Sequence, residues 1–291
     1  MTSGLGAGPR LLVVGVSLDG AEVARLALGH GDDPNSLLAL HGWDVLRVRD
    51  VVRHPVDRSG LTMTFVVRAS PGHLRGVASV PDGARSGHQA VPPNSSARQT
   101  ASGDVAQSGG AFRHQRVAAY AVVTSSRGFL MTQFSSLTGA PGQWGLPGGG
   151  LEAGEAPDRA VLREVWEESG QVIEVSELAL IATSCWVGLA PGGRLEDYHA
   201  VRVIYRAICP DPTEPVVHDI GGTTASAAWL LPADLDLLAL TSGWRSILDE
   251  VTPLAARGAA VSDVVMAPDQ TDCPDHHHDD TDPDDASRPE P

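Results

Sequence analysis

The chain contains no lysine. All 21 of its basic residues are arginines, and they face 36 acidic residues, which gives a formal net charge of −15. This balance argues against a general nucleic-acid binder and against a protein that binds anionic membrane surfaces. Any side chain that grips a phosphate as a fixed cation must be an arginine, whose planar guanidinium suits bidentate contacts.

Cysteines and long apolar runs are also scarce. Cys185, Cys209 and Cys273 have no Cys-x-x-Cys spacing, so the sequence indicates reduced thiols. The apolar run from Leu11 to Leu18 is too short to span a bilayer, and residues 1–10 lack the charged start of a signal peptide. We therefore expect a soluble, cytoplasmic protein with no membrane partner.

Residues 10–69 are typical of a small accessory α/β domain, whose role the sequence does not indicate. The expected elements are a buried strand, two short helices and two further strands: Leu11–Val16, Glu22–Leu28, Ser36–His41, Val45–Val52 and Leu61–Arg68. A dinucleotide-binding loop is not expected. Gly4, Gly6 and Gly8 precede the first strand, whereas a phosphate loop needs its glycines between strand and helix.

Two further segments are poor in large apolar residues. Residues 70–111 are rich in Ser, Gly, Pro and Ala, which predicts a flexible linker. The tail, residues 258–291, has ten acidic residues against one arginine and is expected to be disordered. Cys273 and His276–His278 are able to bind soft metals, but a solvated tail with incidental histidines is the preferred interpretation.

Residues 112–253 predict a second, larger domain with a hairpin near its start and strands and helices after it. The expected strands are Val117–Thr124, Phe129–Phe134, Leu178–Val187, Asp197–Ala207 and Ala225–Leu230. Pro232 is expected to open a helical segment, and residues 243–251 to form a last helix.

The segment from Gly148 to Gly170 carries the chemistry. Gly148, Gly149 and Gly150 predict a flexible turn whose backbone can approach a ligand closely. A helix follows, because Pro157 suits a first helical turn and Gly170 suits a C-terminal cap.

Three carboxylates lie on one face of this helix, since Glu164, Glu167 and Glu168 are spaced i, i+3 and i+4. Such a charge run is often a solvated face, helped here by Arg159 and Arg163. The alternative is a site for a hard divalent cation, which prefers carboxylate oxygen and offsets the repulsion.

The segment from Gly149 to Gln171 resembles the Nudix box, in which fixed glycine, glutamate and arginine positions surround a catalytic helix. The matching residues are Gly149, Glu155, Arg163, Glu164, Val165, Glu167, Glu168 and Gly170. One position departs from the pattern: Gln171 stands where an aliphatic residue is expected, at a place that packs rather than reacts. The preceding run from Trp144 to Gly149 is also typical of the family.

The resemblance implies a Nudix α/β/α sandwich with a mixed sheet, which hydrolyses a pyrophosphate bond in a nucleoside diphosphate linked to another moiety. Glu164, Glu167 and Glu168 would hold Mg²⁺ or Mn²⁺, and Glu167 or Glu168 would take the proton of the attacking water. Arg163 with Glu155 would orient the helix. The amides of Gly148, Gly149 and Gly150 would shape the loop beside the substrate.

Several assignments stay open. Arg202 and Arg206 share one face of an expected strand and are candidates for substrate phosphate, with solvent as the plain alternative. A carboxylate outside the box is expected, but the sequence selects none among Glu196, Asp197, Glu214 and Asp219. A small nucleotide is the expected partner, without nucleic acid, and a homodimer is left open. The alternative function is a Nudix-fold nucleotide sensor or scaffold that does not cleave.

Overall fold

The computed structural model describes residues 10–54, 60–71, 111–189 and 193–252. These residues form two sheets, of which the first belongs to the early part of the chain and the second to the later part. None of the helices among them is long and apolar enough to cross a membrane.

The first sheet has four strands in the order β2-β1-β4-β3, with β1 and β4 parallel and the other pairs antiparallel. Its elements, in chain order, are β1 Leu11–Val16, β2 Glu22–Ala27, α1 Pro34–Leu40, β3 Trp43–Arg53 and β4 Leu61–Ala69. The strands predicted for β1, β3 and β4, and the short helix α1, are confirmed.

Helix α1 begins where the sequence favours a helix start. Asp33 caps it by accepting a hydrogen bond from the Ser36 amide at 2.9 Å, and Pro34 occupies the first turn. On the opposite side of the helix from solvent, Leu38 is fully buried together with Met63 and Phe65. The interior of this sheet is therefore apolar.

One prediction in this region is wrong. Residues 22–28 were expected to form a helix, but Glu22–Ala27 is strand β2, paired antiparallel with β1. Ala, Leu, Arg and Glu favour helix locally, but the segment is only six residues long between turns. Pairing with β1 gives the strand cross-strand hydrogen bonds along one edge, whereas a six-residue helix would form few backbone hydrogen bonds of its own.

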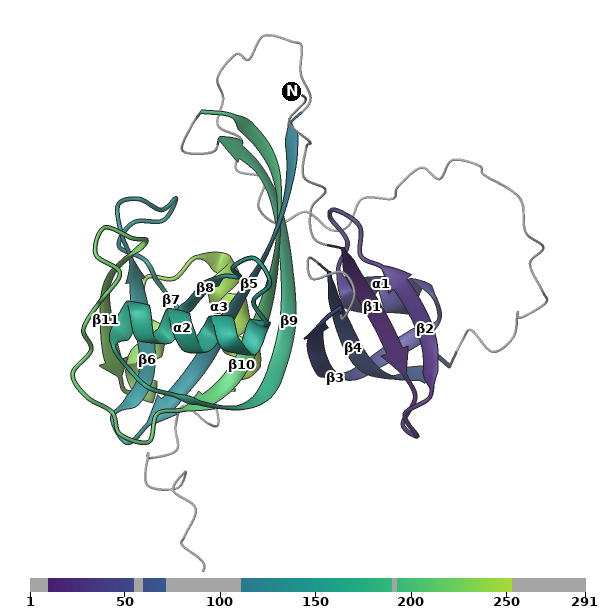
Figure 1. The fold of residues 1–291 in the computed structure, drawn as a ribbon, viewed down its shortest axis with the longest axis horizontal. Helices are drawn as coiled ribbons and strands as arrows, with labels where there is room; N and C mark the ends of the chain where they lie inside the picture. The colour runs from purple at the N-terminus through teal and green to yellow at the C-terminus, as the bar shows by residue number, and fades with distance from the viewer. Residues whose placement is uncertain (1–9, 55–59, 72–110, 190–192, 253–291) are drawn as a thin grey trace, which may run out of the picture. The chain divides into compact units, whose positions relative to one another are not determined.

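The second sheet has seven strands and is mixed (Figure 1). Its main path runs β11-β6-β5-β10-β9, with β7 beside β6 and β8 beside β5. Among the strand pairs of the described residues, β5 and β10 are parallel and the others are antiparallel. The strands are β5 Phe112–Ser125, β6 Gly128–Phe134, β7 Trp144–Gly145, β8 Gly148–Gly150, β9 Glu174–Leu189, β10 Leu195–Ile208 and β11 Thr224–Leu230.

Helices cover both faces of this sheet. Alternate residues of its strands point to opposite sides, and both sides carry apolar side chains that pack against a helix. Helix α2, Pro157–Ser169, packs Val161 and Val165 against one face, together with Val201 and Val203 of β10. Helix α3, Ser242–Val251, packs Trp244 and Leu248 on the other, with Val122 and Ile204. The expected sandwich of a mixed sheet between helices is confirmed.

The helix ends also follow the sequence. Pro157 stands in the first turn of α2, and Gly170 ends the helix with a left-handed backbone, φ 69°. The segment opened by Pro232 is a 3₁₀ helix, η2 Pro232–Leu237, and α3 begins after the capping residue Thr241.

Other predictions have mixed outcomes. The hairpin of β5 and β6 and the strands β9, β10 and β11 are confirmed. Cys185 and Cys209 are free thiols. The predicted linker, apart from its ends, and the predicted acidic tail with Cys273 and His276–His278 lie outside the described residues.

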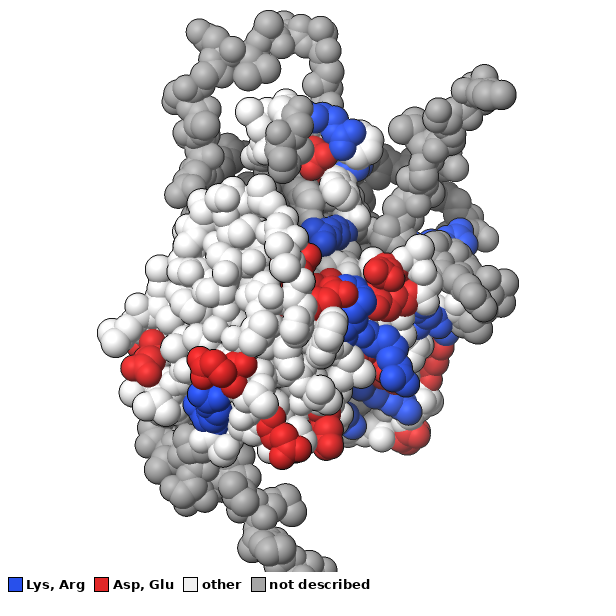
Figure 2. All heavy atoms as spheres, turned by 60° about the vertical axis from the view of Figure 1, so that its left-hand side comes forward, with Lys and Arg blue, Asp and Glu red and all other residues white. Residues whose placement is uncertain are grey.

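Charges of both signs mingle on the surface of the molecule. Figure 2 shows acidic and basic side chains next to one another on one face, beside a broad area without charged groups. The acidic tail holds nine of the fifteen net negative charges of the chain. The rest of the chain is therefore only mildly acidic, and the face in Figure 2 is not a basic surface.

Candidate functional site

The glycine triplet is a strand and not a flexible turn. Gly148, Gly149 and Gly150 form β8, paired antiparallel with Ala118–Tyr120 of β5. The glycines are needed for clearance: a Cβ on Gly149 would lie 2.5 Å from the Glu164 carboxylate. On Gly148, whose φ is 140°, it would lie 2.3 Å from the Ala119 carbonyl oxygen. The triplet therefore lets helix α2 and its carboxylates lie directly on the sheet.

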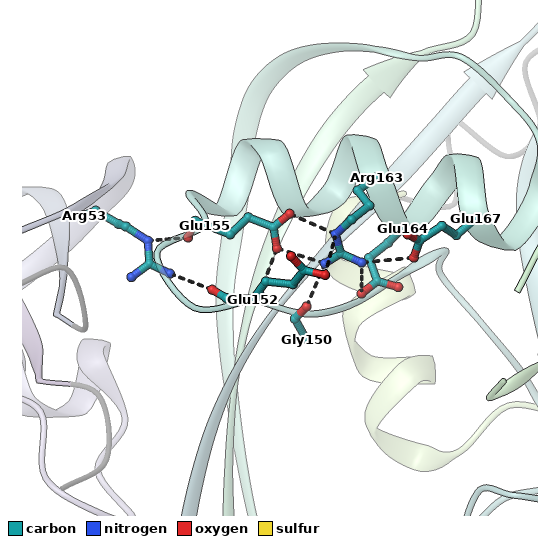
Figure 3. Close-up of polar contacts among 7 residues, drawn as sticks. All are labelled: Arg53, Gly150, Glu152, Glu155, Arg163, Glu164 and Glu167. Carbon is teal, nitrogen blue, oxygen red and sulfur yellow. Dashed lines mark hydrogen bonds and ion pairs between the residues drawn. The ribbon is translucent and has the colours of Figure 1, made fainter. Parts of the chain in front are cut away.

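Arg163 is the centre of the polar network on α2 (Figure 3). Its guanidinium makes a bidentate pair with Glu155, with Nε to Oε1 and Nη2 to Oε2 both at 2.9 Å. Nη2 also donates to the Gly150 carbonyl at 3.1 Å. These contacts raise the pKa of Arg163 and lower the pKa of Glu155. Arg163 thus ties the helix to the loop before it and to β8.

Two of the three box carboxylates converge on a single positive group. Glu164 Oε1 and Glu167 Oε2 each accept a hydrogen bond from Nη1 of Arg163 at 3.0 Å (Figure 3). Burial raises the pKa of Glu164, although Arg163 opposes the rise. The charge run of the sequence is therefore not a solvated face, because the Glu164 side chain is only 16% exposed.

Glu168 turns toward the sheet. It is buried, and it accepts hydrogen bonds from the Gly148 amide at 2.9 Å and from the Thr224 hydroxyl on β11. Burial raises the pKa of this carboxyl to about 7, although the hydrogen bonds from Thr224 and Gly148 partly oppose the rise. Buried carboxylates are costly without such partners, so Thr224 and Gly148 hold Glu168 in place.

The residues present fit a hard divalent cation. Within the described ranges no three acidic, histidine or cysteine side chains are gathered closely enough to ligate one ion. Mg²⁺, however, usually takes only one or two protein carboxylates and completes its shell with water and substrate oxygens. The convergence of Glu164 and Glu167 on one cationic nitrogen provides that pair of oxygen donors.

The departure from the box pattern has a structural explanation. Gln171 is buried; its amide nitrogen donates to Ser169 O and Thr213 Oγ1, and its oxygen accepts from the Thr213 amide. Val172, the next residue, is 74% exposed. The position packs as expected, and the amide fastens the end of α2 to the segment after β10.

That segment brings one outside carboxylate to the box. The backbone amides of His218 and Asp219 donate to the Glu167 carbonyl at 2.7 and 3.0 Å, and the charge of Asp219 adds to the raised pKa of Glu168. The other three candidates form ion pairs elsewhere: Glu196 with Arg194, Asp197 with Arg113, and Glu214 with Arg127. Asp219 is therefore the candidate that the fold brings nearest to Glu168.

The two arginines proposed for substrate contact have different surroundings. Arg202 lines a pocket on the α3 side of the sheet and donates to Ser184 Oγ at 2.7 Å. Arg206, four residues further along β10, pairs with Glu177 at 3.0 Å and is not part of that pocket wall. A contact between Arg206 and substrate phosphate therefore stays a prediction from the sequence.

Two residues beside the carboxylates were missed from the sequence. Arg116 on β5 lies over Gly150, where a Cβ would be 2.3 Å from its Nη2, and its charge is among those that oppose the burial-driven rise in the pKa of Glu164. Thr224 on β11 bonds to Glu168. Neither carries a local signal, since only the pairing of β5 with β8 and the curl of the sheet bring them to the box.

Known proteins resemble the second part of the chain. The family model for the NUDIX domain matches residues 114–251. A nucleoside triphosphatase NudI from Enterobacter is 36% identical over 63 residues, which are 21% of this chain and 45% of that protein. A MutT-like protein from Streptomyces ambofaciens is 60% identical over 37 residues, which are 13% of this chain and 24% of that protein. An Escherichia coli NudI is 25% identical over 42% of this chain and 85% of its own length. The chain thus spans less than half of the first two relatives.

Proposed function

Since the chain belongs to the Nudix family through residues 114–251, we propose that it is a metal-dependent hydrolase of a pyrophosphate bond in a small nucleotide. One observation carries the proposal: the Glu164 and Glu167 carboxylates both lie 3.0 Å from Nη1 of Arg163. Two carboxylates that share one positive group are suited to share a divalent ion as well.

Each residue then has a defined task. Glu164 and Glu167 would hold Mg²⁺ or Mn²⁺, and Glu168 would complete the carboxylate set that the sequence predicts. Such an ion neutralises phosphate charge and lowers the pKa of a bound water. Arg163 and Glu155 fix α2 against β8, so that the carboxylates keep their spacing. Glu168 and Asp219 are the candidates for taking the proton of the attacking water, since Asp219 is exposed and near Glu168.

The substrate class rests on the relatives. Two of them are described as nucleoside triphosphatases, and this supports a nucleoside phosphate ester with at least one phosphate anhydride bond. Arg116, beside Gly150 and the Glu164 charge, is placed to contact the phosphate chain.

The deciding experiment compares the full chain with its Glu167→Gln and Asp219→Asn variants. Turnover is measured with saturating Mg²⁺ on nucleoside triphosphates, nucleotide sugars and dinucleoside polyphosphates, with product analysis. Glu167→Gln is expected to reduce turnover at least about a hundredfold, because the divalent ion loses one of its carboxylate ligands and so stabilises the phosphate charge less well. If Asp219 takes the proton, Asp219→Asn gives a loss of the same order.

A thermal melt without metal and a Mn²⁺ titration complete the test. Glu167→Gln keeps helix propensity and an oxygen that can accept from Arg163, and it removes the repulsion between Glu167 and Glu164 together with the ion pair to Arg163. Its melting temperature should therefore stay close to that of the parent. Its Mn²⁺ affinity should fall. Full turnover by Glu167→Gln would remove this residue from the machinery. Nucleotide binding without any cleavage by the parent chain would favour the sensor function instead.

A further inference from the structure

The pocket on the α3 side of the second sheet has a volume of about 210 Å³. Strands β5, β6, β9 and β10 and helix α3 all contribute to its wall. Its lining residues are Arg116, Ala118, Tyr120, Phe134, Trp186, Tyr198, Ala200, Arg202 and Trp244. A wall of five aromatic rings, two alanines and two arginines is unusual for a surface and suits a flat ligand.

The rings are arranged in two pairs that frame the pocket. Trp186 and Tyr198 are stacked with centroids 4.3 Å apart, and Trp186 remains 46% exposed. Tyr120 and Trp244 meet edge to face at 4.8 Å. Stacking on aromatic side chains stabilises a bound base whatever its identity, so these rings supply affinity and not selectivity.

The polar groups of the wall are almost all donors. The lining contains no carboxylate and no carboxamide side chain; its two guanidinium groups can only donate, and the tyrosine hydroxyls can donate or accept. Arg202 uses Nη1 for Ser184 and lies 5.5 Å from the Trp244 ring centroid. Among the described residues Arg202 has no carboxylate within ion-pair distance, which leaves its remaining N–H groups for a ligand.

We propose that this pocket binds a nucleobase through acceptors on its edge, and that Arg202 selects bases with a keto group over bases with an amino group at that position. The proposal rests on the proposed function, because it names the substrates of that same site. A guanidinium donates well to the O6 and N7 of guanine or to the O4 of uracil and thymine. The exocyclic amino groups of adenine and cytosine would place a donor against a donor.

The position of Arg116 fits a nucleotide whose base lies at Arg202 and whose phosphates lie nearer the carboxylates. Both arginines line the pocket. Arg116 lies at Gly150 of β8, where its charge also acts on Glu164, and Arg202 lies on β10, on the other side of β5 from β8. Both charges act on the phenol of Tyr120 between them, where they oppose the rise in pKa that burial causes. A nucleotide with its base at Arg202 would therefore extend its phosphates past Arg116 toward the carboxylates.

The test measures binding without catalysis. The full chain, with EDTA present, is titrated calorimetrically with GMP, UMP, AMP and CMP. GMP and UMP are expected to bind about tenfold or more tightly than AMP and CMP, the scale of one well-placed base contact. Equal affinities, a preference for AMP or CMP, or no binding of any of the four would overturn the proposal.

Arg202→Gln sharpens the test, because a carboxamide both donates and accepts and pairs well with adenine N6 and N7. This variant should lose the preference for GMP and gain affinity for AMP. Arg127→Gln, whose guanidinium pairs with Glu214 outside the pocket, should keep the selectivity of the parent. A uniform loss for all four nucleotides in Arg202→Gln would mean that Arg202 binds phosphate, and the proposal would fail. Because no metal or cleavage is involved, selective binding without hydrolysis would contradict only the proposed function.

Discussion

The four-stranded and the seven-stranded sheet each contain one parallel pair of strands among antiparallel neighbours, β1 with β4 and β5 with β10. Their interiors differ. The first sheet buries apolar side chains such as Leu38 and Met63, whereas every buried polar or charged side chain of the described residues belongs to the later part of the chain. Burying a charged group is costly unless it is held by partners, as Glu168 is held. Among the described residues, the buried polar side chains therefore belong to the part of the chain that carries the proposed site.

The largest effect on stability is expected in the first sheet. Leu38→Ala should lower the free energy of unfolding of this part of the chain by about 2–5 kcal/mol, because it leaves a cavity beneath α1. Turnover without denaturant should stay unchanged. The free energy of unfolding is measured by urea titration, and turnover is measured on the same samples.

The matched control is Leu40→Ala on the same helix, whose side chain is 77% exposed, and which should be nearly neutral. A parallel loss of turnover in Leu38→Ala would break the comparison, because the first sheet would then support the site.

A smaller effect is expected where β11 holds Glu168. Thr224→Val keeps the shape but removes the hydroxyl that donates to this carboxylate. Groups that orient metal-binding side chains typically contribute about ten- to a hundredfold in metal affinity, so Mn²⁺ binding should weaken by that factor. A Mn²⁺ titration and turnover against metal concentration provide the two readouts.

Two variants separate orientation from simple destabilisation. Thr224→Ser restores a hydroxyl and should recover most of the metal affinity. Ser226→Ala removes a hydroxyl from the same strand that donates to Gln133 and not to a carboxylate, so it should change nothing. Equal metal affinity in Thr224→Val and the parent would show that Thr224 does not orient Glu168.

The smallest effect is expected at the residue that departs from the box pattern. Gln171→Leu restores the aliphatic residue but loses the hydrogen bonds to Thr213 and Ser169. We expect a destabilisation of about 1 kcal/mol, since apolar burial offsets part of the lost bonding, with turnover unchanged. Val172→Ala, at an exposed position, is the control in a urea titration. A gain in stability would mean that the amide contributes nothing to the fold.

The sequence was informative wherever a local signal had a single meaning. Pro157 and Gly170 marked the ends of α2, and the alternation in β10 marked its buried face. It misled where tertiary pairing outweighed local preference: Glu22–Ala27 pairs with β1, and the glycine triplet pairs with β5.

The site could be predicted only in part, for a similar reason. Glu164 and Glu167 are spaced i, i+3, and Arg163 and Glu167 are spaced i, i+4, so the approach of each pair follows from helical spacing. Asp219, Thr224 and the aromatic pocket come from segments far apart in the chain, and their meeting depends on the register of the sheet. No periodicity in a single segment could indicate them.

Arg116 on strand β5 connects the two proposed ligand sites. Arg116 belongs both to the wall of the aromatic pocket and to the surroundings of Glu164, so the two ligand sites share a charged side chain. Shared groups make binding events thermodynamically linked: whatever factor a bound nucleotide applies to the affinity for a divalent ion, the ion must apply to the affinity for the nucleotide. The nucleotide affinity of this protein therefore depends on the metal concentration, and the metal affinity depends on the nucleotide concentration. Each affinity has to be measured at a stated concentration of the other ligand.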